Sequence, residues 1–178
     1  MRKLLNSELD RLSIEEFKKT PKIPLIVVLD DIRSLNNIGS VFRTSDAFLV
    51  QQIHLCGITA KPPHREIQKT ALGATESVDW LYFENILDSI QILKKQGFKI
   101  YAIEQADESI SLDELRLNKN DKIAVIMGNE IKGVKDAIIQ DIDGCIELEQ
   151  YGTKHSLNIS VCSGIVIHYL FQKLKSLP

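Results

Sequence analysis

Apolar positions along the chain fall into short runs with two different spacings. Runs rich in β-branched residues occur at 25–30, 52–58, 77–83, 98–104, 122–128 and 144–149, and helix-like patterns occur at 37–49, 86–96, 134–140 and 156–175. This alternation predicts an α/β protein with a mostly parallel sheet and helices on both faces. The runs at 25–29 and 123–127 show no polar alternation, so we expect them to be central strands.

The start of the chain differs from the rest of this pattern. Ser13 followed three residues later by Glu16 is a helix start signal, and two prolines then interrupt the chain before the first strand-like run. We therefore predict an N-terminal helical arm at residues 1–24 and a single domain at residues 25–178.

The last helical segment is apolar almost all the way round. One stripe carries Leu157, Val161, Ile165 and Tyr169, and a second carries Ile159, Val166 and Leu170. A helix without a polar face must be covered on several sides. Two interpretations stay open: a central core helix, or a helix whose outer part forms a subunit interface.

Composition is typical of an ordinary globular protein, with 44% apolar and 26% charged residues in a chain of 178. The N-terminus is too polar for a signal peptide, and no later stretch holds about 18 uncharged apolar residues. We therefore expect a cytoplasmic protein without a membrane segment. A net charge of -2 does not favour nucleic-acid binding by itself, so such binding would need a local basic patch, which dimerisation could enlarge.

The cysteines give no sign of a metal centre. Cys56, Cys145 and Cys162 lack the CxxC spacing of structural zinc sites, so we expect reduced, buried thiols and no metal. His54 with Cys56 could be considered as ligands, but their apolar strand context favours core packing.

Three polar loops each follow a strand-like run, and ligands bind beyond the carboxyl ends of strands in open α/β sheets. The first loop leads into the helix predicted at 37–49. There Asn36 or Asn37 can cap the helix, Gly39 allows close backbone approach, and Arg43 falls in the second turn. A capped amphipathic helix with a solvated arginine would give the same pattern.

The second loop, MGNEIKG at 127–133, places Gly128 and Gly133 on either side of Asn129 and Glu130. Its backbone can therefore approach a flat ligand closely, although a plain strand-to-helix turn has similar residues. The loop lacks both the GxGxxG spacing of dinucleotide sites and the GK[ST] ending of phosphate loops. A Rossmann-type nucleotide-binding enzyme is therefore a distant alternative.

The third loop, YGTKHSLN at 151–158, connects a strand to the last helix, with Ser156 as its expected N-cap. His155 beside Ser156 could suggest a hydrolase. Adjacent residues rarely point at one another, however, and no GxSxG nucleophile elbow is present.

In this order, the three loops resemble the motifs of the SpoU, or TrmH-like, branch of the SPOUT RNA methyltransferases. The first family motif, N-x-G-x-x-x-R-T-x-x-A-F, is matched at 37–48, and the second, G-N-E-x-x-G after an apolar strand, at 128–133. The third, S-L-N-V-S, is matched at 156–160 with Ile159 for valine. KTALGA at 69–74 is similar to the family's intermediate K-T-S-L-G-A.

This resemblance covers about residues 25–172 and implies a SpoU-type methyltransferase domain at 25–178 that ends in a deep trefoil knot. It implies S-adenosylmethionine as cofactor, RNA as substrate, and a homodimer whose interface completes the active site. Many relatives have Pro-Met before the third motif, where this chain has Glu149-Gln150. The glutamine at this position resembles a subgroup of the family whose members act on tRNA, so tRNA is slightly favoured over ribosomal RNA.

The resemblance also assigns site residues by their position in the motifs. The residues expected at the cofactor are Ile103, Glu104, Gly128, Asn129, Leu148 and Leu157, and the expected catalytic residues are Arg43, Asn37, Glu130, Ser156 and Asn158. Arg43 would act on the ribose 2'-hydroxyl, either as a deprotonated general base or as a cation that stabilises the developing alkoxide. The alternative is a catalytically inactive RNA-binding module of the same fold, which would be expected to have lost such residues.

Overall fold

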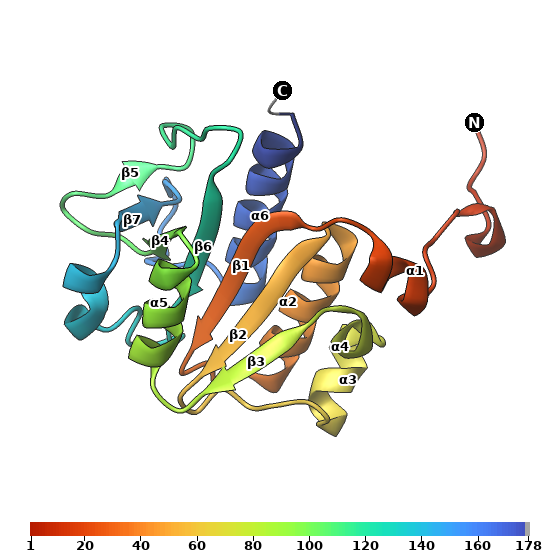
Figure 1. Ribbon diagram of the computed structural model, residues 1–178, viewed down its shortest axis with the longest axis horizontal. Coiled ribbons are helices and arrows are strands. Elements are labelled where there is room, and N and C mark those ends of the chain that lie inside the picture. The colour runs from red at the N-terminus through yellow and green to blue at the C-terminus, as the bar shows by residue number, and fades with distance from the viewer. Residues whose placement is uncertain (177–178) are drawn as a thin grey trace.

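The computed structural model describes residues 1–176 (Figure 1). Its strands are β1 (Ile23–Asp30), β2 (Val50–Cys56), β3 (Trp80–Phe83), β4 (Phe98–Ile103), β5 (Ile110–Ser111), β6 (Lys122–Met127) and β7 (Gly144–Glu147). They form one sheet of seven strands in the order β3-β2-β1-β6-β4-β7-β5. Every pair of neighbouring strands is parallel, which confirms the predicted sheet.

The two runs without polar alternation are β1 and β6, and they lie side by side near the middle of the sheet. Leu25 to Leu29 pair in register with Ile123 to Met127, and all these residues are buried. Strands covered on both faces have no solvent side to mark with polar residues. Their central position was therefore predictable.

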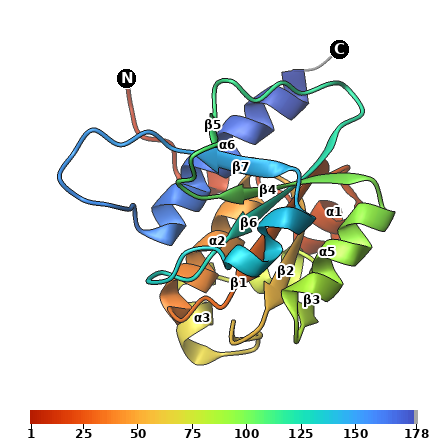
Figure 2. The same cartoon turned by 90° about the vertical axis from the view of Figure 1, so that its left-hand side faces the viewer.

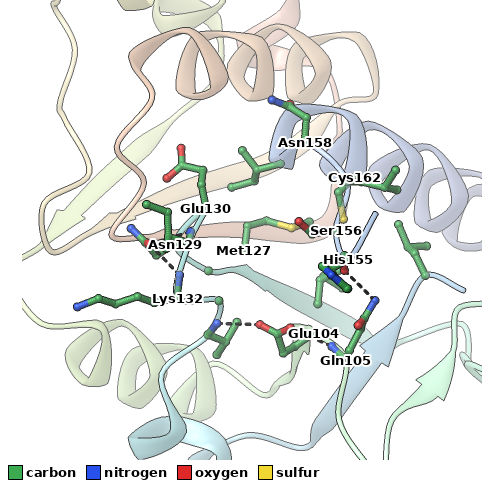
Figure 3. A pocket seen from close by; sticks show the side chains of 18 of the residues that line it. Glu104, Gln105, Met127, Asn129, Glu130, Lys132, His155, Ser156, Asn158 and Cys162 are labelled. Carbon is green, nitrogen blue, oxygen red and sulfur yellow. Dashed lines mark hydrogen bonds between the residues drawn. The ribbon is translucent and has the colours of Figure 1, made fainter. Parts of the chain in front are cut away.

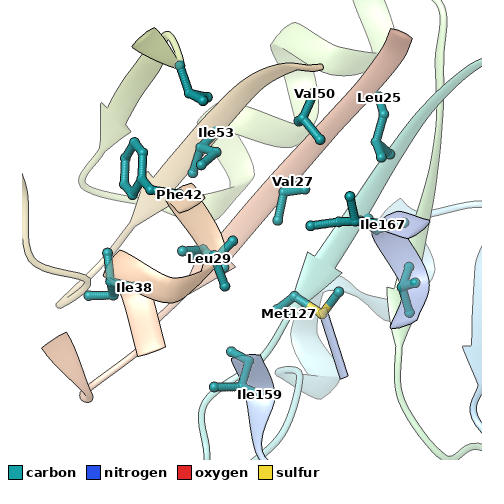
Figure 4. Packing of buried hydrophobic residues seen from close by; sticks show 14 of the residues in the cluster. Leu25, Val27, Leu29, Ile38, Phe42, Val50, Ile53, Met127, Ile159 and Ile167 are labelled. Carbon is teal, nitrogen blue, oxygen red and sulfur yellow. The ribbon is translucent and has the colours of Figure 1, made fainter. Parts of the chain in front are cut away.

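Helices cover both faces of the sheet. They are α1 (Ile14–Lys19), α2 (Leu35–Ala47), α3 (Arg65–Ala71), α4 (Ala74–Ser77), α5 (Ile86–Lys95) and α6 (Ile159–Ser176), with 3-10 helices η1 (Asn6–Glu8) and η2 (Asp136–Asp141). On one face, Val27 and Leu29 pack with Phe42 of α2 and Ile167 of α6 (Figure 4). On the other, Val28 packs in a second cluster with residues of α5 and η2.

The close packing of α2 against α3 depends on Gly39. A Cβ atom at this position would lie 2.1 Å from the Thr70 hydroxyl oxygen and 2.3 Å from the Ile67 carbonyl oxygen. The predicted close backbone approach is therefore real, but its partner is helix α3.

Several predicted helix ends were wrong. Helix α2 is capped by Ser34, whose side chain accepts a hydrogen bond from the Asn37 N–H, so neither Asn36 nor Asn37 is the cap and Arg43 begins the third turn. Helix α6 begins at Ile159, three residues after Ser156.

The cap position of α6 is occupied by Asn158. Its carboxamide oxygen accepts from the Ser160 N–H at 2.9 Å, and its carbonyl oxygen accepts from the Cys162 N–H. The segment predicted as a helix at 134–140 overlaps the 3-10 helix η2, and α3 and most of α4 occupy a stretch that the apolar pattern left without elements.

The N-terminal segment contacts the rest of the protein through α1. Ser13 and Glu16 form the capping box that the sequence predicted, and Phe17 is buried in the core on the α2 side of the sheet. No helix in residues 1–176 is both long and apolar enough to cross a membrane. The three cysteines are free; Cys56 and Cys145 are buried as expected, whereas Cys162 is half-buried.

Candidate functional site

A cavity of about 650 Å³ lies beyond the carboxyl ends of three adjacent strands, β6, β4 and β7 (Figure 3). Its walls come from the residues that directly follow these strands and from the start of α6. The lining comprises residues 103–105, 127–134, 136, 148, 150, 155–159 and 162. This is the edge at which open parallel sheets bind ligands.

The loop at 128–134, between β6 and η2, is fixed by the side chain of Asn129. The carboxamide oxygen accepts from the backbone N–H groups of Ile131 and Lys132, at 3.0 and 3.1 Å. The carboxamide nitrogen donates to the Asp31 carbonyl oxygen at 2.7 Å. Asn129 therefore ties the loop to itself and to the end of β1.

Glu104 holds the same loop from the opposite side. Its carboxylate accepts from the Val134 N–H at 2.9 Å and from the Gln105 N–H at 3.0 Å. Gly133 has a φ of 66°, and a Cβ atom there would lie 2.2 Å from a Glu104 carboxylate oxygen. This position therefore requires glycine both for its backbone conformation and for space.

A chain of hydrogen bonds joins the three loops that the sequence singled out. The Glu130 carboxylate accepts from Asn37 Nδ2 at 3.3 Å, and Asn37 Oδ1 accepts from Asn158 Nδ2 at 3.2 Å. Glu130 also accepts from the backbone N–H groups of Arg33 and Ser34, both at 3.0 Å. Partial burial opposes ionisation, but these donors outweigh it and lower the pKa of Glu130.

The loop at 149–158, between β7 and α6, has few such contacts. Figure 2 shows this segment swinging out from the body of the protein. Residues 151–158 are all exposed, and Tyr151 is 91% exposed. A 3.3 Å hydrogen bond from the Gln105 side chain to the His155 carbonyl oxygen is one of its few connections to the opposite wall.

The structure brings most of the sequence-predicted site residues together. All six expected at the cofactor line the cavity: Ile103, Glu104, Gly128, Asn129, Leu148 and Leu157. Glu130, Ser156 and Asn158 line it too, and Asn37 reaches it through its hydrogen bonds to Glu130 and Asn158.

Arg43 lies apart from this group. It is exposed on α2 and lines a different cavity, of about 460 Å³, between the N-terminal segment, α2 and the α3–α4 connection. Within residues 1–176, no hydrogen bond or ion pair joins Arg43 to Asn37 or Glu130. In a single chain, Asn37 and Glu130 therefore do not bind the Arg43 guanidinium.

Other lining residues were not predicted from the sequence. They are Gln105, Met127, Lys132, His155 and Cys162, among others. Met127 ends β6, and Cys162 lies one helical turn after Asn158, so their spacing was an available signal. Gln105, Lys132 and His155 are exposed polar loop residues, and nothing in their local sequence distinguishes them.

His54 and Cys56 do not line the cavity and are buried in the core beneath α5. The His54 ring shares a 2.7 Å hydrogen bond with the Ser89 hydroxyl, and burial lowers the pKa of His54 to about 4. Burial likewise raises the pKa of Cys56 to about 12. Both residues are packed in the core, as the sequence indicated.

Comparison with known proteins identifies the family of this chain. The SpoU rRNA methylase family model matches residues 24–168. A Borreliella burgdorferi protein named "Uncharacterized tRNA/rRNA methyltransferase" is 32% identical over 92% of this chain and 70% of its own length. The Aquifex aeolicus tRNA (guanosine(18)-2'-O)-methyltransferase is 31% identical over 93% of this chain and 76% of its own.

A solved structure also shares the fold of this chain. The structure of an AdoMet-bound rRNA methyltransferase from Sinorhizobium meliloti superposes with a TM-score of 0.80, at 24% identity over 89% of this chain and 60% of that one. The family model alone spans most of the chain, and it includes all three loops around the cavity. The resemblance found in the sequence is thereby confirmed: the chain belongs to the SpoU rRNA methylase family.

Proposed function

We propose that this chain transfers the methyl group of S-adenosylmethionine to a ribose 2'-hydroxyl of RNA, with tRNA favoured over ribosomal RNA. It is an RNA methyltransferase of the SpoU family, and the named relatives act on tRNA or ribosomal RNA. One observation carries the proposal most strongly. Three loops far apart in sequence meet at one cavity, and the Glu130–Asn37–Asn158 hydrogen bonds link them.

The cavity suits S-adenosylmethionine in size and in chemistry. Its volume of about 650 Å³ lies in the range of small-molecule sites. Ile103, Leu148 and Leu157 would offer apolar surface to an adenine ring, while backbone carbonyl groups at 128–134 would offer hydrogen-bond acceptors. These residues, with Glu104 and Asn129 as the supports of the wall, would hold the cofactor.

The chemistry requires the reacting atoms to be held in line. When bound, S-adenosylmethionine supplies a methyl carbon activated by its sulfonium. The protein aligns the 2'-oxygen with that carbon and assists loss of its proton, which requires no metal. Ser156 and Asn158, which precede α6, would hold the ribose, and Asn37, itself bound by Glu130, would hold the Asn158 side chain.

Arg43 is the residue proposed to act on the 2'-oxygen. An arginine side chain is charged in nearly every protein environment, which favours a cation that grips the adjacent phosphate and stabilises the developing alkoxide over a general base. Because Arg43 lies outside the cavity of its own chain, we propose that a second copy brings its Arg43 to this cavity.

A homodimer would also cover an apolar surface. One of the two stripes predicted on the last helix is buried, with Val166 and Leu170 at 0% exposure. The other remains open over most of its length, with Leu157, Val161 and Ile165 at 40%, 52% and 45%, whereas its last member, Tyr169, is half-buried against the core. This stripe begins at the cavity, so a subunit contact on it would lie beside the cofactor.

We also propose a domain organisation, a knotted topology and a cellular location for this chain. Residues 25–178 would form the methyltransferase domain, with residues 1–24 as an arm. The segment after β7 would thread a deep trefoil knot, which the similarity of fold to family structures supports. The protein would work in the cytoplasm.

The test is to incubate the purified protein with labelled S-adenosylmethionine and either tRNA or ribosomal RNA, and then to identify the labelled nucleosides. We expect label in a 2'-O-methylated nucleoside, predominantly in tRNA. Arg43→Ala should reduce transfer about 10²-fold or more while S-adenosylmethionine binding, followed by calorimetry, is unchanged. Arg116→Ala, which removes an exposed arginine in the connection between the edge strand β5 and β6, is the matched control. Cofactor binding without transfer would instead indicate an inactive RNA-binding module.

A further inference from the structure

The cavity beside Arg43 has walls from three separate parts of the chain. Residues 10–14 and 17 belong to the N-terminal segment, Arg43, Asp46 and Ala47 to α2, and residues 71–74 and 77 to the stretch around α4, with Leu49 between them. Its volume of about 460 Å³ is enough for one nucleotide. The KTALGA motif at 69–74 supplies one wall, and the function proposed above gives that motif no role.

The N-terminal wall is anchored to the body of the protein. Phe17 is 4% exposed, and the Lys22 ammonium lies 4.3 Å above its ring and donates hydrogen bonds to the Phe17 and Thr20 carbonyl oxygens. Helix α1 packs against α4 (Figure 1). The residues just before α1, including Arg11 and Leu12, are therefore held at the cavity by the docked helix.

The groups around this cavity match the parts of a nucleotide. Arg11 and Arg43 have exposed guanidinium groups. A guanidinium can bind two oxygens of one phosphate through two parallel hydrogen bonds. Leu12 and Leu72 are apolar and 51% and 65% exposed, so both can pack against the flat ring of a base.

The carboxylates at this cavity, from Asp46 and Asp10, are compatible with a bound nucleotide. The Asp46 carboxylate already accepts a hydrogen bond from the Ser77 hydroxyl. Asp10 is exposed, and a carboxylate can accept from the N–H groups of a base edge. A site with two arginines, a carboxylate and exposed leucines fits a ribonucleotide better than a purely apolar segment.

We propose that this cavity binds one nucleotide of the substrate RNA next to the methylated position, with Arg11 contacting its phosphate and Leu12 and Leu72 contacting its base. This inference rests on the proposed RNA methyltransferase function and extends it, because Arg43 would link the nucleotide subsite to the reaction. The N-terminal arm then takes part in substrate selection, and RNA sequence beside the target nucleotide affects binding.

The experiment compares Arg11→Ala with Arg116→Ala as a matched control for the loss of one surface arginine. For each variant we would measure the RNA dissociation constant at several salt concentrations, KM and kcat for RNA, and S-adenosylmethionine affinity. We expect Arg11→Ala to raise KM for RNA about tenfold at nearly constant kcat and cofactor affinity. The slope of log affinity against log salt should fall by about 0.7, the value for one phosphate contact on a single strand.

The outcomes separate this inference from the function on which it rests. If wild type methylates RNA and Arg11→Ala matches Arg116→Ala in KM and salt slope, the nucleotide subsite is wrong and the enzyme function stands. A change in mass by light scattering on Arg11→Ala or Leu12→Ala, without a change in RNA affinity, would show a subunit contact instead. If wild type transfers no methyl group, the RNA affinities and salt slopes still decide whether Arg11 contacts phosphate.

Discussion

The two loops that face each other across the cavity proposed to bind S-adenosylmethionine differ sharply in how they are held. The loop at 128–134 has its polar groups tied by Asn129, Glu104 and Glu130, and Lys135 just beyond it pairs with Asp31 at 2.7 Å. The loop at 149–158 is exposed along most of its length. One wall of the cavity is therefore fixed by contacts within the chain, whereas the other wall has few such contacts.

This difference has a consequence for binding. A wall that is already fixed costs little ordering free energy when a ligand binds, whereas an exposed loop must be ordered at that moment. The exposed loop also runs directly into the open apolar stripe of α6. We infer that the cofactor and a second subunit together fix the second wall.

The largest effect is expected from breaking the subunit contact on the exposed side. Val161→Glu places a charge on the open stripe, where Val161 is 52% exposed and so is not needed for the fold of one chain. We expect light scattering to report one chain instead of two, and methyl transfer to fall about 10²-fold because Arg43 of a second copy is lost. Ile92→Glu, at 36% exposure on α5, is the control. A dimer that persists, or a fully active monomer, would contradict the proposed contact.

The next effect comes from loosening the fixed wall. Asn129→Ala removes three hydrogen bonds, each with a net contribution of about 1 kcal/mol. We expect the free energy of unfolding to fall by about 2–3 kcal/mol and S-adenosylmethionine affinity to fall about tenfold. Denaturant unfolding and calorimetry would measure both. Asn120→Ala, in an exposed turn before β6, should change neither quantity.

Acid should weaken the fixed wall through Glu130. Its pKa in the folded protein is lowered from the ordinary value of 4.5, so its contribution to stability is complete above that value. The contribution is lost as the pH falls below about 4.5 and through the folded-state pKa. Unfolding measured against pH should therefore show a smaller acid-side loss in Glu130→Gln than in wild type. Equal losses in both proteins would mean that the Arg33 and Ser34 N–H groups do not favour the ionised carboxylate.

The smallest effect is expected in the exposed loop. Tyr151 is 91% exposed, and its hydroxyl donates to the nearby Glu149 carboxylate. Tyr151→Ala should change the free energy of unfolding by less than about 0.5 kcal/mol. A loss above about 1 kcal/mol would show that this loop is held in the isolated chain.

The sheet, its central strands and the family could be predicted from the sequence, because buried parallel strands and glycine-containing motifs leave strong local patterns. Helix ends were less predictable. Ser34, Asn36 and Asn37 are all good N-cap residues within four positions, and Ser34 is also in contact with Glu130, 96 residues away.

The site was predictable where it follows strand ends and less so where distant segments meet. The six residues expected at the cofactor end or directly follow β4, β6 and β7, or precede α6, so their shared cavity follows from the topology. The position of Arg43 beside the N-terminal arm depends on α1 docking against α4. No local pattern reports that contact.

Hydrogen exchange with and without S-adenosylmethionine tests most directly whether this cavity is the cofactor site. We predict that amides of 128–134 are protected before the cofactor is added, and that those of 149–158 gain protection when it binds. If the cofactor binds, as shown by calorimetry, but leaves 149–158 unchanged, or protects residues around Arg43 and the N-terminal arm instead, the cofactor site is not the cavity between these two loops.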